Sequence, residues 1–272
     1  MKIAISNIAW MPSEDEKIYQ MMQELDIHGL EISPFRILKN LSHYTHTELS
    51  KFCKKINQKN IHVVAMQSLL YNQPHLKIFG SKEDRCQTLE HLKRCVLIGS
   101  ELGVRALVLG SPKNRFIGKM ERSEAIEIAL DFFCKLGDFA YKNGVFICIE
   151  PLPREYGADF LCNTKEVIYF IQQVSNPGIK LHIDLGAMTM NEEDYEQTIE
   201  EGLKSAIHFH ISEPHLQPVS FQSKTDHKRI FRILDKFKYN NWVSIEMRAL
   251  SEFTNLSFVK DALKFVKEIY GS

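Results

Sequence analysis

The chain has 272 residues, of which 44% are hydrophobic, 25% charged and 10% aromatic, a composition typical of a globular protein with a large core. Lysine plus arginine equals aspartate plus glutamate at 34 each, so there is no net positive charge to attract a nucleic-acid backbone or an anionic membrane. The composition therefore excludes a largely disordered chain and argues against nucleic-acid and membrane partners.

The six cysteines are scattered along the chain without a Cys-x-x-Cys pair, and most lie in apolar stretches. We expect buried, reduced thiols at all of them: Cys53, Cys86, Cys95, Cys134, Cys148 and Cys162. The first residues contain too short an apolar stretch for a signal peptide, and no run approaches a membrane span. These patterns predict a reducing, cytoplasmic compartment.

Apolar runs rich in Ile, Val and Leu recur along the whole chain, at residues 3–9, 29–33, 61–67, 104–110, 145–150, 179–184, 206–211 and 242–247. The segment after the first run opens with a capping-box pattern at 13–16 and places Ile18, Met22 and Leu25 on one helical face. Further helices are predicted over 47–60, 81–102, 123–143, 164–174, 192–203, 226–237 and 257–269.

Several predicted helices end in glycine directly before the next apolar run, as at Gly103 and Gly144, which is typical of a helix handing over to a strand. Strands and helices in strict alternation, with the strands apolar on both faces, predict a parallel sheet covered by helices, and eight strands close a barrel. We therefore predict an α/β protein with one (β/α)8 TIM barrel domain over 1–272. An open doubly wound sheet is the alternative, but the first run lacks a Gly-x-Gly-x-x-Gly turn and no linker divides the chain.

Acidic or imidazole side chains close the last four apolar runs: Glu150, Asp184, His210 and Glu246. In a closed parallel barrel the carboxyl ends of the strands form the rim at which active sites lie. Each acid by itself is also typical of a helix cap or a partner of lysine. Four such groups on four successive strands favour a site for one divalent metal ion.

Two histidines lie deeper on the same strands. Because side chains two residues apart share a strand face, His182 points the same way as Asp184, and His208 the same way as His210. We expect each of them to fill the barrel or support a ligand rather than to bind the metal directly. We also count His182 among the candidate substrate contacts.

The ordered set of strand motifs resembles the xylose isomerase-like barrel superfamily, which includes ketose 3-epimerases and other sugar phosphate isomerases and epimerases, hydroxypyruvate isomerases, inosose dehydratases and DNA-repair enzymes of the endonuclease IV type. The motifs are Gly-Leu-Glu at 29–31, Ile-Glu-Pro-Leu at 149–152, His-Ile-Asp-Leu-Gly at 182–186, His-Phe-His-Ile-Ser-Glu at 208–213 and Val-Ser-Ile-Glu at 243–246. The resemblance spans essentially the whole chain. It implies that Glu150, Asp184, His210 and Glu246 hold one divalent metal, manganese first, with magnesium, cobalt or zinc as alternatives.

The resemblance also implies a function, the isomerisation or epimerisation of a sugar, sugar phosphate or other sugar derivative through an enediolate. The metal would acidify the proton next to a substrate carbonyl, and Glu150 and Glu246 would remove and return it as catalytic acid and base. A small-molecule sugar is then the partner, and a homo-oligomer is expected by analogy. Two alternatives remain: a metal-dependent dehydratase of a keto-polyol, as in the inosose dehydratases, and a non-catalytic carbohydrate-binding barrel.

Two positions depart from the family pattern. Where the ketose epimerases carry a histidine and an arginine that contact the sugar, this chain has Ala187 and Leu216, so we expect a substrate other than a free ketohexose. The three-zinc DNA-repair enzymes need additional histidines where this chain has Gln67, the 109–110 segment and Ala187. Too few ligands remain for three metals, and endonuclease activity is not expected.

Further candidates for substrate contacts follow other strands. Trp10 would form an apolar wall against a sugar, with packing under a helix as the alternative. Glu31 and Gln67 would bind hydroxyl groups, unless they act as caps. Glu213 would bind substrate or orient a ligand, again with a loop cap as the alternative.

Basic residues also gather after the predicted rim positions: Lys113, Arg115, Arg154 and Arg248. Solvated loop charges are the simplest interpretation. If these side chains converge, with Arg248 as a substrate contact, they favour a phosphate or carboxylate on the substrate, because a guanidinium group binds such anions through two hydrogen bonds.

Overall fold

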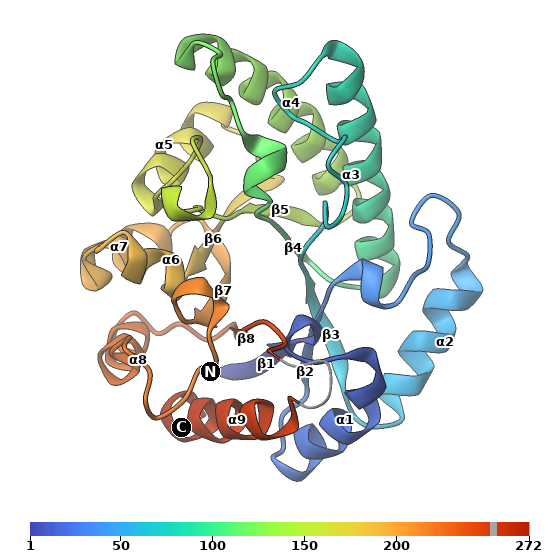
Figure 1. Ribbon diagram of the computed structural model, residues 1–272, viewed down its shortest axis with the longest axis vertical. Coiled ribbons are helices and arrows are strands. Elements are labelled where there is room, and N and C mark those ends of the chain that lie inside the picture. Colours follow the sequence, from blue (N-terminus) through green and yellow to red (C-terminus); the bar gives the residue numbers. More distant parts are fainter. Residues whose placement is uncertain (251–254, 272) are drawn as a thin grey trace.

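The computed structural model describes residues 1–250 and 255–271, and within them the strands form a closed barrel (Figure 1). The strands are β1 (Lys2–Ser6), β2 (Gly29–Ile32), β3 (His62–Met66), β4 (Ala106–Leu109), β5 (Phe146–Ile149), β6 (Ile179–Asp184), β7 (Ala206–Ser212) and β8 (Trp242–Glu246). Each strand pairs in parallel with its neighbours in sequence, and β8 pairs in parallel with β1. This closure confirms the predicted (β/α)8 barrel over the open sheet.

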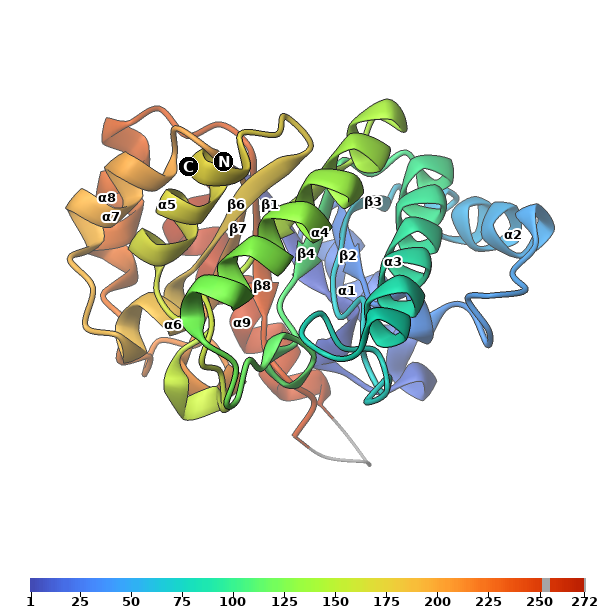
Figure 2. The same cartoon turned by 90° about the horizontal axis from the view of Figure 1, so that it is seen from above.

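Helices surround the barrel on its outer side (Figures 1 and 2). They are α1 (Asp15–Glu24), α2 (His46–Asn57), α3 (Lys82–Leu102), α4 (Arg122–Lys142), α5 (Thr164–Val174), α6 (Leu185–Met190), α7 (Tyr195–Gly202), α8 (His227–Lys236) and α9 (Leu256–Tyr270). The apolar faces of strands and helices pack together into one large core, as the helical periodicity predicts.

The helix α6 was not predicted, because its six residues are too few to show helical periodicity and it follows β6 without a loop. Gly186 allows this tight connection, since a Cβ atom there would lie 2.8 Å from the main-chain oxygen of Glu213.

The helix predicted over 192–203 is observed as α7, which is shorter than expected. Asp194 caps its observed start by accepting a hydrogen bond from the main-chain N–H of Gln197.

The inside of the barrel is divided into a small apolar part and a polar part. Strands β3 to β5 contribute the cluster of Ala65, Ala106, Val108 and Cys148. Strands β2, β6, β7 and β8 contribute fully or almost fully buried polar side chains: Glu31, His182, His208, His210 and Ser244. The expectation that the strands are apolar on both faces is therefore wrong for these four, and the small side chains opposite leave room for the imidazole rings.

All six cysteines lie in the described part of the chain and are free. Cys95, Cys148 and Cys162 are buried as predicted, whereas Cys86 and Cys134 are exposed, so the prediction of burial is wrong for these two. They lie on α3 and α4, whose outer faces meet solvent. Across residues 1–250 and 255–271, no helix combines the length and apolar character that crossing a membrane requires.

Candidate metal and catalytic site

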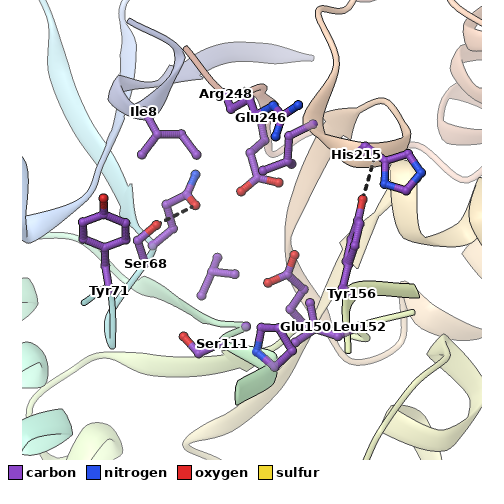
Figure 3. A pocket seen from close by; sticks show the side chains of 15 residues that line it. Ile8, Ser68, Tyr71, Ser111, Glu150, Leu152, Tyr156, His215, Glu246 and Arg248 are labelled. Carbon is purple, nitrogen blue, oxygen red and sulfur yellow. Dashed lines mark hydrogen bonds between the residues drawn. The ribbon is translucent and has the colours of Figure 1, made fainter. Parts of the chain in front are cut away.

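A cavity of about 430 Å³ opens at the carboxyl ends of the strands (Figure 3). The carboxylates of Glu150 on one wall and Glu246 on the other point toward each other across it. Val108 on β4 also lines the cavity, and the remaining lining residues come from the segments after the strands: Ile8, Gln67, Ser68, Tyr71, Gly110, Ser111, Pro112, Leu152, Tyr156, His215, Leu216 and Arg248.

His210 lies at the centre of the polar part of the barrel. Its Nε2 atom is 2.9 Å from Glu31 Oε2 and 3.1 Å from Glu31 Oε1. Its Nδ1 atom is 3.2 Å from Glu246 Oε2 and 3.7 Å from Asp184 Oδ2, yet makes a hydrogen bond to neither. One ring nitrogen is thus held by a carboxylate, while the other faces two further carboxylates.

Asp184 is fixed at the junction of β6 and α6. Its Oδ1 atom accepts a hydrogen bond from the main-chain N–H of Ala187 at 2.6 Å, so Asp184 is also a helix cap. Its Oδ2 atom accepts a hydrogen bond from the Ser212 hydroxyl at 2.6 Å, and that hydroxyl accepts one from the N–H of Gly186 at 2.9 Å. The carboxylate is therefore held rigidly beside His210.

Glu150 is positioned by its neighbours on β4 and in the following loop. A Cβ atom at Gly110 would lie only 2.1 Å from Glu150 Oε2, so the carboxylate occupies the space that glycine leaves open. The buried Arg115 donates a hydrogen bond from Nη2 to the main-chain oxygen of Glu150 at 2.8 Å. Both contacts direct the Glu150 side chain into the cavity.

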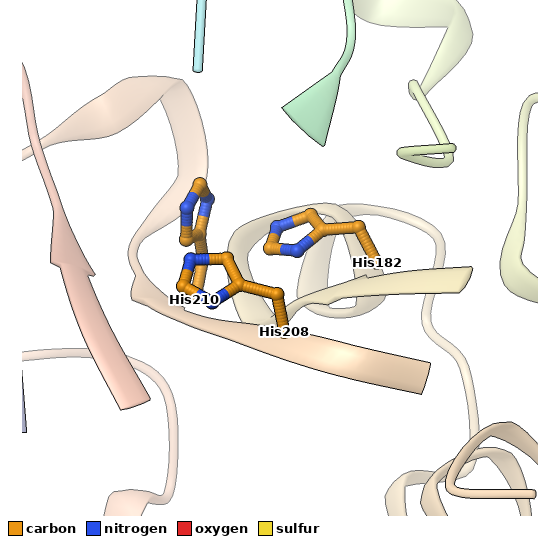
Figure 4. A group of neighbouring side chains, drawn as sticks. All are labelled: His182, His208 and His210. Carbon is orange, nitrogen blue, oxygen red and sulfur yellow. The ribbon is translucent and has the colours of Figure 1, made fainter. Parts of the chain in front are cut away.

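Three imidazole rings meet below the cavity floor, from His182 on β6 and from His208 and His210 on β7 (Figure 4). The alternation along β6 places His182 on the same side as Asp184, as predicted. One donor atom from each of Glu150, His182, Asp184 and His210 lies within 4.8 Å of the others. Within residues 1–250 and 255–271, neither ring nitrogen of His182 has a hydrogen-bond partner.

The charges of this buried group shift the pKa values of its members in opposite directions. Burial, together with the nearby carboxylates of Glu246 and Asp184, raises the pKa of Glu150 well above its usual value. Burial also raises the pKa of Glu246, although His210 partly offsets this effect. Both carboxyl groups on the cavity walls are therefore more easily protonated than an exposed glutamate.

The groups deeper in the barrel show the opposite tendency. Burial opposes the charge on Glu31, but His210 and His208 outweigh it and hold the pKa of Glu31 well below its usual value. Burial likewise opposes the charge on His210, but Glu31 and Glu246 raise the pKa of His210 well above its usual value. Burial and the neighbouring His210 lower the pKa of His182, so this ring is neutral.

The residues of this site fit a divalent metal ion. Three buried ring nitrogens lack a hydrogen-bond partner in the described part of the chain, namely Nδ1 and Nε2 of His182 and Nδ1 of His210, although buried polar atoms are normally paired. Carboxylate oxygens and imidazole nitrogens are common ligands of divalent first-row metals. Of the four predicted ligands, Glu150, Asp184 and His210 belong to the group whose donor atoms lie within 4.8 Å of one another. The fourth, Glu246, has its Oε2 atom 3.2 Å from Nδ1 of His210.

The sequence profile of the xylose isomerase-like TIM barrel family matches residues 19–269. The chain belongs to this family. No curated protein sequence matches the chain.

Solved structures share the family fold over nearly their whole length. A D-psicose 3-epimerase in the presence of D-fructose has a TM-score of 0.81 and 17% identity, with 100% of both chains covered. The apo form of a 3-keto-D-glucoside 4-epimerase from E. coli has a TM-score of 0.81 and 17% identity, covering 98% of this chain and 99% of that one. An IOLI protein with a bound zinc atom has a TM-score of 0.75 and 15% identity, covering 100% and 98%. At such low identity the likeness shows the fold alone.

Two residues expected at the xylose isomerase-like site lie away from the cavity. Trp10 is 1% exposed, and its indole N–H donates a hydrogen bond to Asp15 at 2.8 Å, so it packs beneath α1 instead of forming a cavity wall. Glu31 is 0% exposed and binds His208, His210 and the Ser244 hydroxyl, which leaves no surface for a sugar. Its hydrogen bonds fix the orientation of the His208 and His210 rings.

Of the other candidate substrate contacts, two line the cavity and two do not. Gln67 lines the cavity and donates a hydrogen bond to the Ser6 hydroxyl at 2.7 Å, and Arg248 also lines the cavity. Glu213 instead pairs with His227 at 2.9 Å outside the cavity. His182 is 0% exposed and does not line the cavity, but it lies beside Glu150, Asp184 and His210.

The expected cluster of basic side chains does not form. Arg248 lines the cavity, but Arg115 is only 1% exposed behind Glu150. Lys113 and Arg154 are exposed and lie outside the cavity lining. The interpretation of solvated loop charges is correct for these two, whereas burial of Arg115 was not predicted.

Several cavity residues were missed in the sequence. Tyr156 and His215 form one wall, where the Tyr156 hydroxyl accepts a hydrogen bond from the main-chain N–H of His215 at 2.8 Å. His215 and Leu216 have φ angles of 60° and 55°, an uncommon conformation that turns this loop over the cavity. Ser212 was detectable in principle, because it follows His210 by two residues on the same strand face.

Proposed function

We propose that this protein is a divalent-metal-dependent isomerase or epimerase of a sugar or sugar derivative. The observation that carries the proposal is the opposition of Glu150 and Glu246 across the cavity, with Asp184 and His210 beside them. The sugar epimerases among the structures of the same fold support it.

Glu150, Asp184, His210 and Glu246 are the residues that would hold the metal, with His182 close by. A bound divalent ion supplies Lewis acidity, which makes the proton on the carbon next to a substrate carbonyl easier to remove. Manganese is the ion that the family resemblance favours, with magnesium, cobalt and zinc as alternatives.

The two glutamates would perform the proton transfer. A carboxylate oxygen of Glu246 takes the proton from one side of the substrate carbon, and the carboxyl group of Glu150 returns a proton from the opposite wall. Return to the other face of the same carbon gives an epimer, and return to the adjacent carbon gives an isomer.

The cavity walls support a substrate with an anionic group. The guanidinium group of Arg248 lines the cavity, and no ion pair to it occurs within residues 1–250 and 255–271. Ala187 and Leu216 offer no polar side chain where ketose epimerases carry histidine and arginine. A phosphorylated or acidic sugar derivative therefore fits this cavity better than a free ketohexose.

Exchange with solvent deuterium tests the proposal. Keto-sugars, their phosphates and sugar acids are incubated with the metal-loaded protein in D2O, and NMR follows deuterium at the carbon next to the carbonyl. We expect exchange in one substrate class, abolished in Glu246→Gln and Glu150→Gln and retained in Glu155→Gln, which alters an exposed loop. Absence of exchange with every compound, or equal exchange in all variants, would overturn it.

The same experiment separates the two alternatives. A keto-polyol dehydratase would use the same enediolate and release water, so its product would be smaller by one water molecule in the mass spectrum. A carbohydrate-binding barrel would bind a sugar without any deuterium entering it.

We also propose a cytoplasmic location, based on the cysteine pattern, and a homo-oligomeric state, based on analogy.

A further inference from the structure

The imidazole of His182 is the least explained polar group inside the barrel. It is 0% exposed, and neither Nδ1 nor Nε2 has a hydrogen-bond partner among the residues that the structure describes. A neutral imidazole carries one donor and one acceptor, and leaving both unpaired in the interior is costly. A phenyl ring would fill the same space without this cost, so packing alone does not account for a histidine here.

The surroundings of His182 suggest what pairs with it. One ring nitrogen lies within 4.8 Å of donor atoms of Glu150, Asp184 and His210, and each of these is within the same distance of the others. The ligands of a tetrahedral zinc ion lie about 3.4 Å apart when each bond is about 2.1 Å long. Side-chain rotations that draw these four groups closer together would therefore bring one atom of each onto one cation.

A site built from the three histidines is less favoured, although their ring nitrogens also lie within 4.8 Å of one another. Nε2 of His208 and Nε2 of His210 are both held by Glu31, at 3.1 Å and 2.9 Å. A cation there would compete with these hydrogen bonds. The nitrogens without partners, on His182 and His210, instead face the group that contains Glu150 and Asp184.

We propose that His182 is a direct metal ligand, so that its imidazole joins that of His210 and the carboxylates already assigned to the site. This inference rests on the metal site of the proposed function. A second imidazole shifts the preference of the site from magnesium or manganese toward zinc or cobalt, because imidazole nitrogen suits these ions better.

Metal titration of His182→Phe tests the proposal without any substrate. Metal-free wild type, His182→Phe and His182→Leu are titrated with Co²⁺, read by its visible absorption, and with Zn²⁺ and Mg²⁺ in competition with a chelator. The control is His91→Phe, since His91 is a buried histidine on α3 that contacts the Leu69 main-chain oxygen and does not belong to the group of possible metal ligands. Urea unfolding of each metal-free variant reports whether the fold is retained.

We expect both His182 variants to lose affinity for Zn²⁺ and Co²⁺ by about 100-fold or more, beyond the effect of altering a supporting residue. Mg²⁺ affinity should change much less, the cobalt spectrum should change, and the metal-free variants should unfold no earlier than wild type. Wild-type affinity in both folded variants, or an equal loss for all three metals, would overturn the role of His182 and leave the proposed function intact. Failure of the wild type to bind any of the metals would overturn both.

Discussion

The carboxylate of Glu31 accepts a hydrogen bond from Nε2 of His210 at 2.9 Å, across the barrel from β2 to β7 and over 179 residues of sequence. This contact places the proton of the imidazole on Nε2, so that in the neutral ring the lone pair of Nδ1 faces Asp184 and Glu246. Carboxylates that hold the second nitrogen of a metal-binding histidine in this way also raise its basicity.

Replacing Glu31 with glutamine should weaken metal binding by about 10- to 100-fold, because it removes the charge that orients His210. Glu213→Gln is the matched control, since Glu213 is also a buried glutamate paired with a histidine, His227, but lies outside the cavity. Isothermal titration with Zn²⁺ or Mn²⁺ measures both. Equal losses in the two variants would contradict a specific role for Glu31.

Replacing Gly110 with alanine should displace the Glu150 carboxylate, because the new Cβ atom would lie 2.1 Å from Oε2. We expect a loss of about 100-fold in the rate of deuterium exchange, since a misplacement of about 1 Å has this effect on a catalytic group. The free energy of unfolding should change by less than about 1 kcal/mol, because the end of a flexible side chain can move.

A double-variant cycle identifies the cause. Displacement of the Glu150 carboxylate should also weaken metal binding. In a Glu150→Ala background no carboxylate meets the new methyl group, so Gly110→Ala should cause no further loss of metal affinity. A further loss of the same size in that background would show that Gly110→Ala acts through the backbone and not through Glu150.

The stability of the protein should depend on pH through Glu14. Burial alone would raise the pKa of Glu14, but hydrogen bonds from Asn255 and Met11 outweigh it and lower the pKa. Because the folded pKa lies below the unfolded one, the contribution of Glu14 to stability is complete above about pH 4.5 and is lost as the pH falls through the folded pKa.

The variant Glu14→Gln should therefore lower the free energy of unfolding by about 1–3 kcal/mol at pH 7, with a smaller difference from wild type below pH 4. Urea unfolding at both pH values measures this. Glu124→Gln, an exposed position on α4, serves as the control. A deficit of the same size at both pH values would mean that the charge of Glu14 is not involved.

Replacing Arg248 with alanine should weaken the binding of an anionic substrate by about 10- to 100-fold, the effect of losing a hydrogen bond to a charged group. A neutral sugar should bind equally well to both proteins. Lys113→Ala is the control, because Lys113 is an exposed cation outside the cavity. Affinities unchanged for phosphorylated and free sugars alike would exclude Arg248 as an anion contact.

The sequence by itself determined the barrel and the rim. Strand and helix periods depend on residues a few positions apart, so the alternation of elements is visible in the printed order of residues. The polar ends of β5 to β8 were visible for the same reason, because a charge after an apolar run marks the end of a strand. The sequence did not predict α6, because a helix of six residues is too short to show a helical repeat of apolar positions.

Only the tertiary structure decided which side chains face one another across the barrel. Glu31 and Trp10 follow or end strands like the other candidates, yet Glu31 is turned toward His210 and Trp10 packs beneath α1. Arg115 looked like a loop charge and is buried behind Glu150. The two unpaired nitrogens of His182 are visible only when every possible partner has a position, because hydrogen bonding and burial depend on atoms brought together by folding and not on sequence separation.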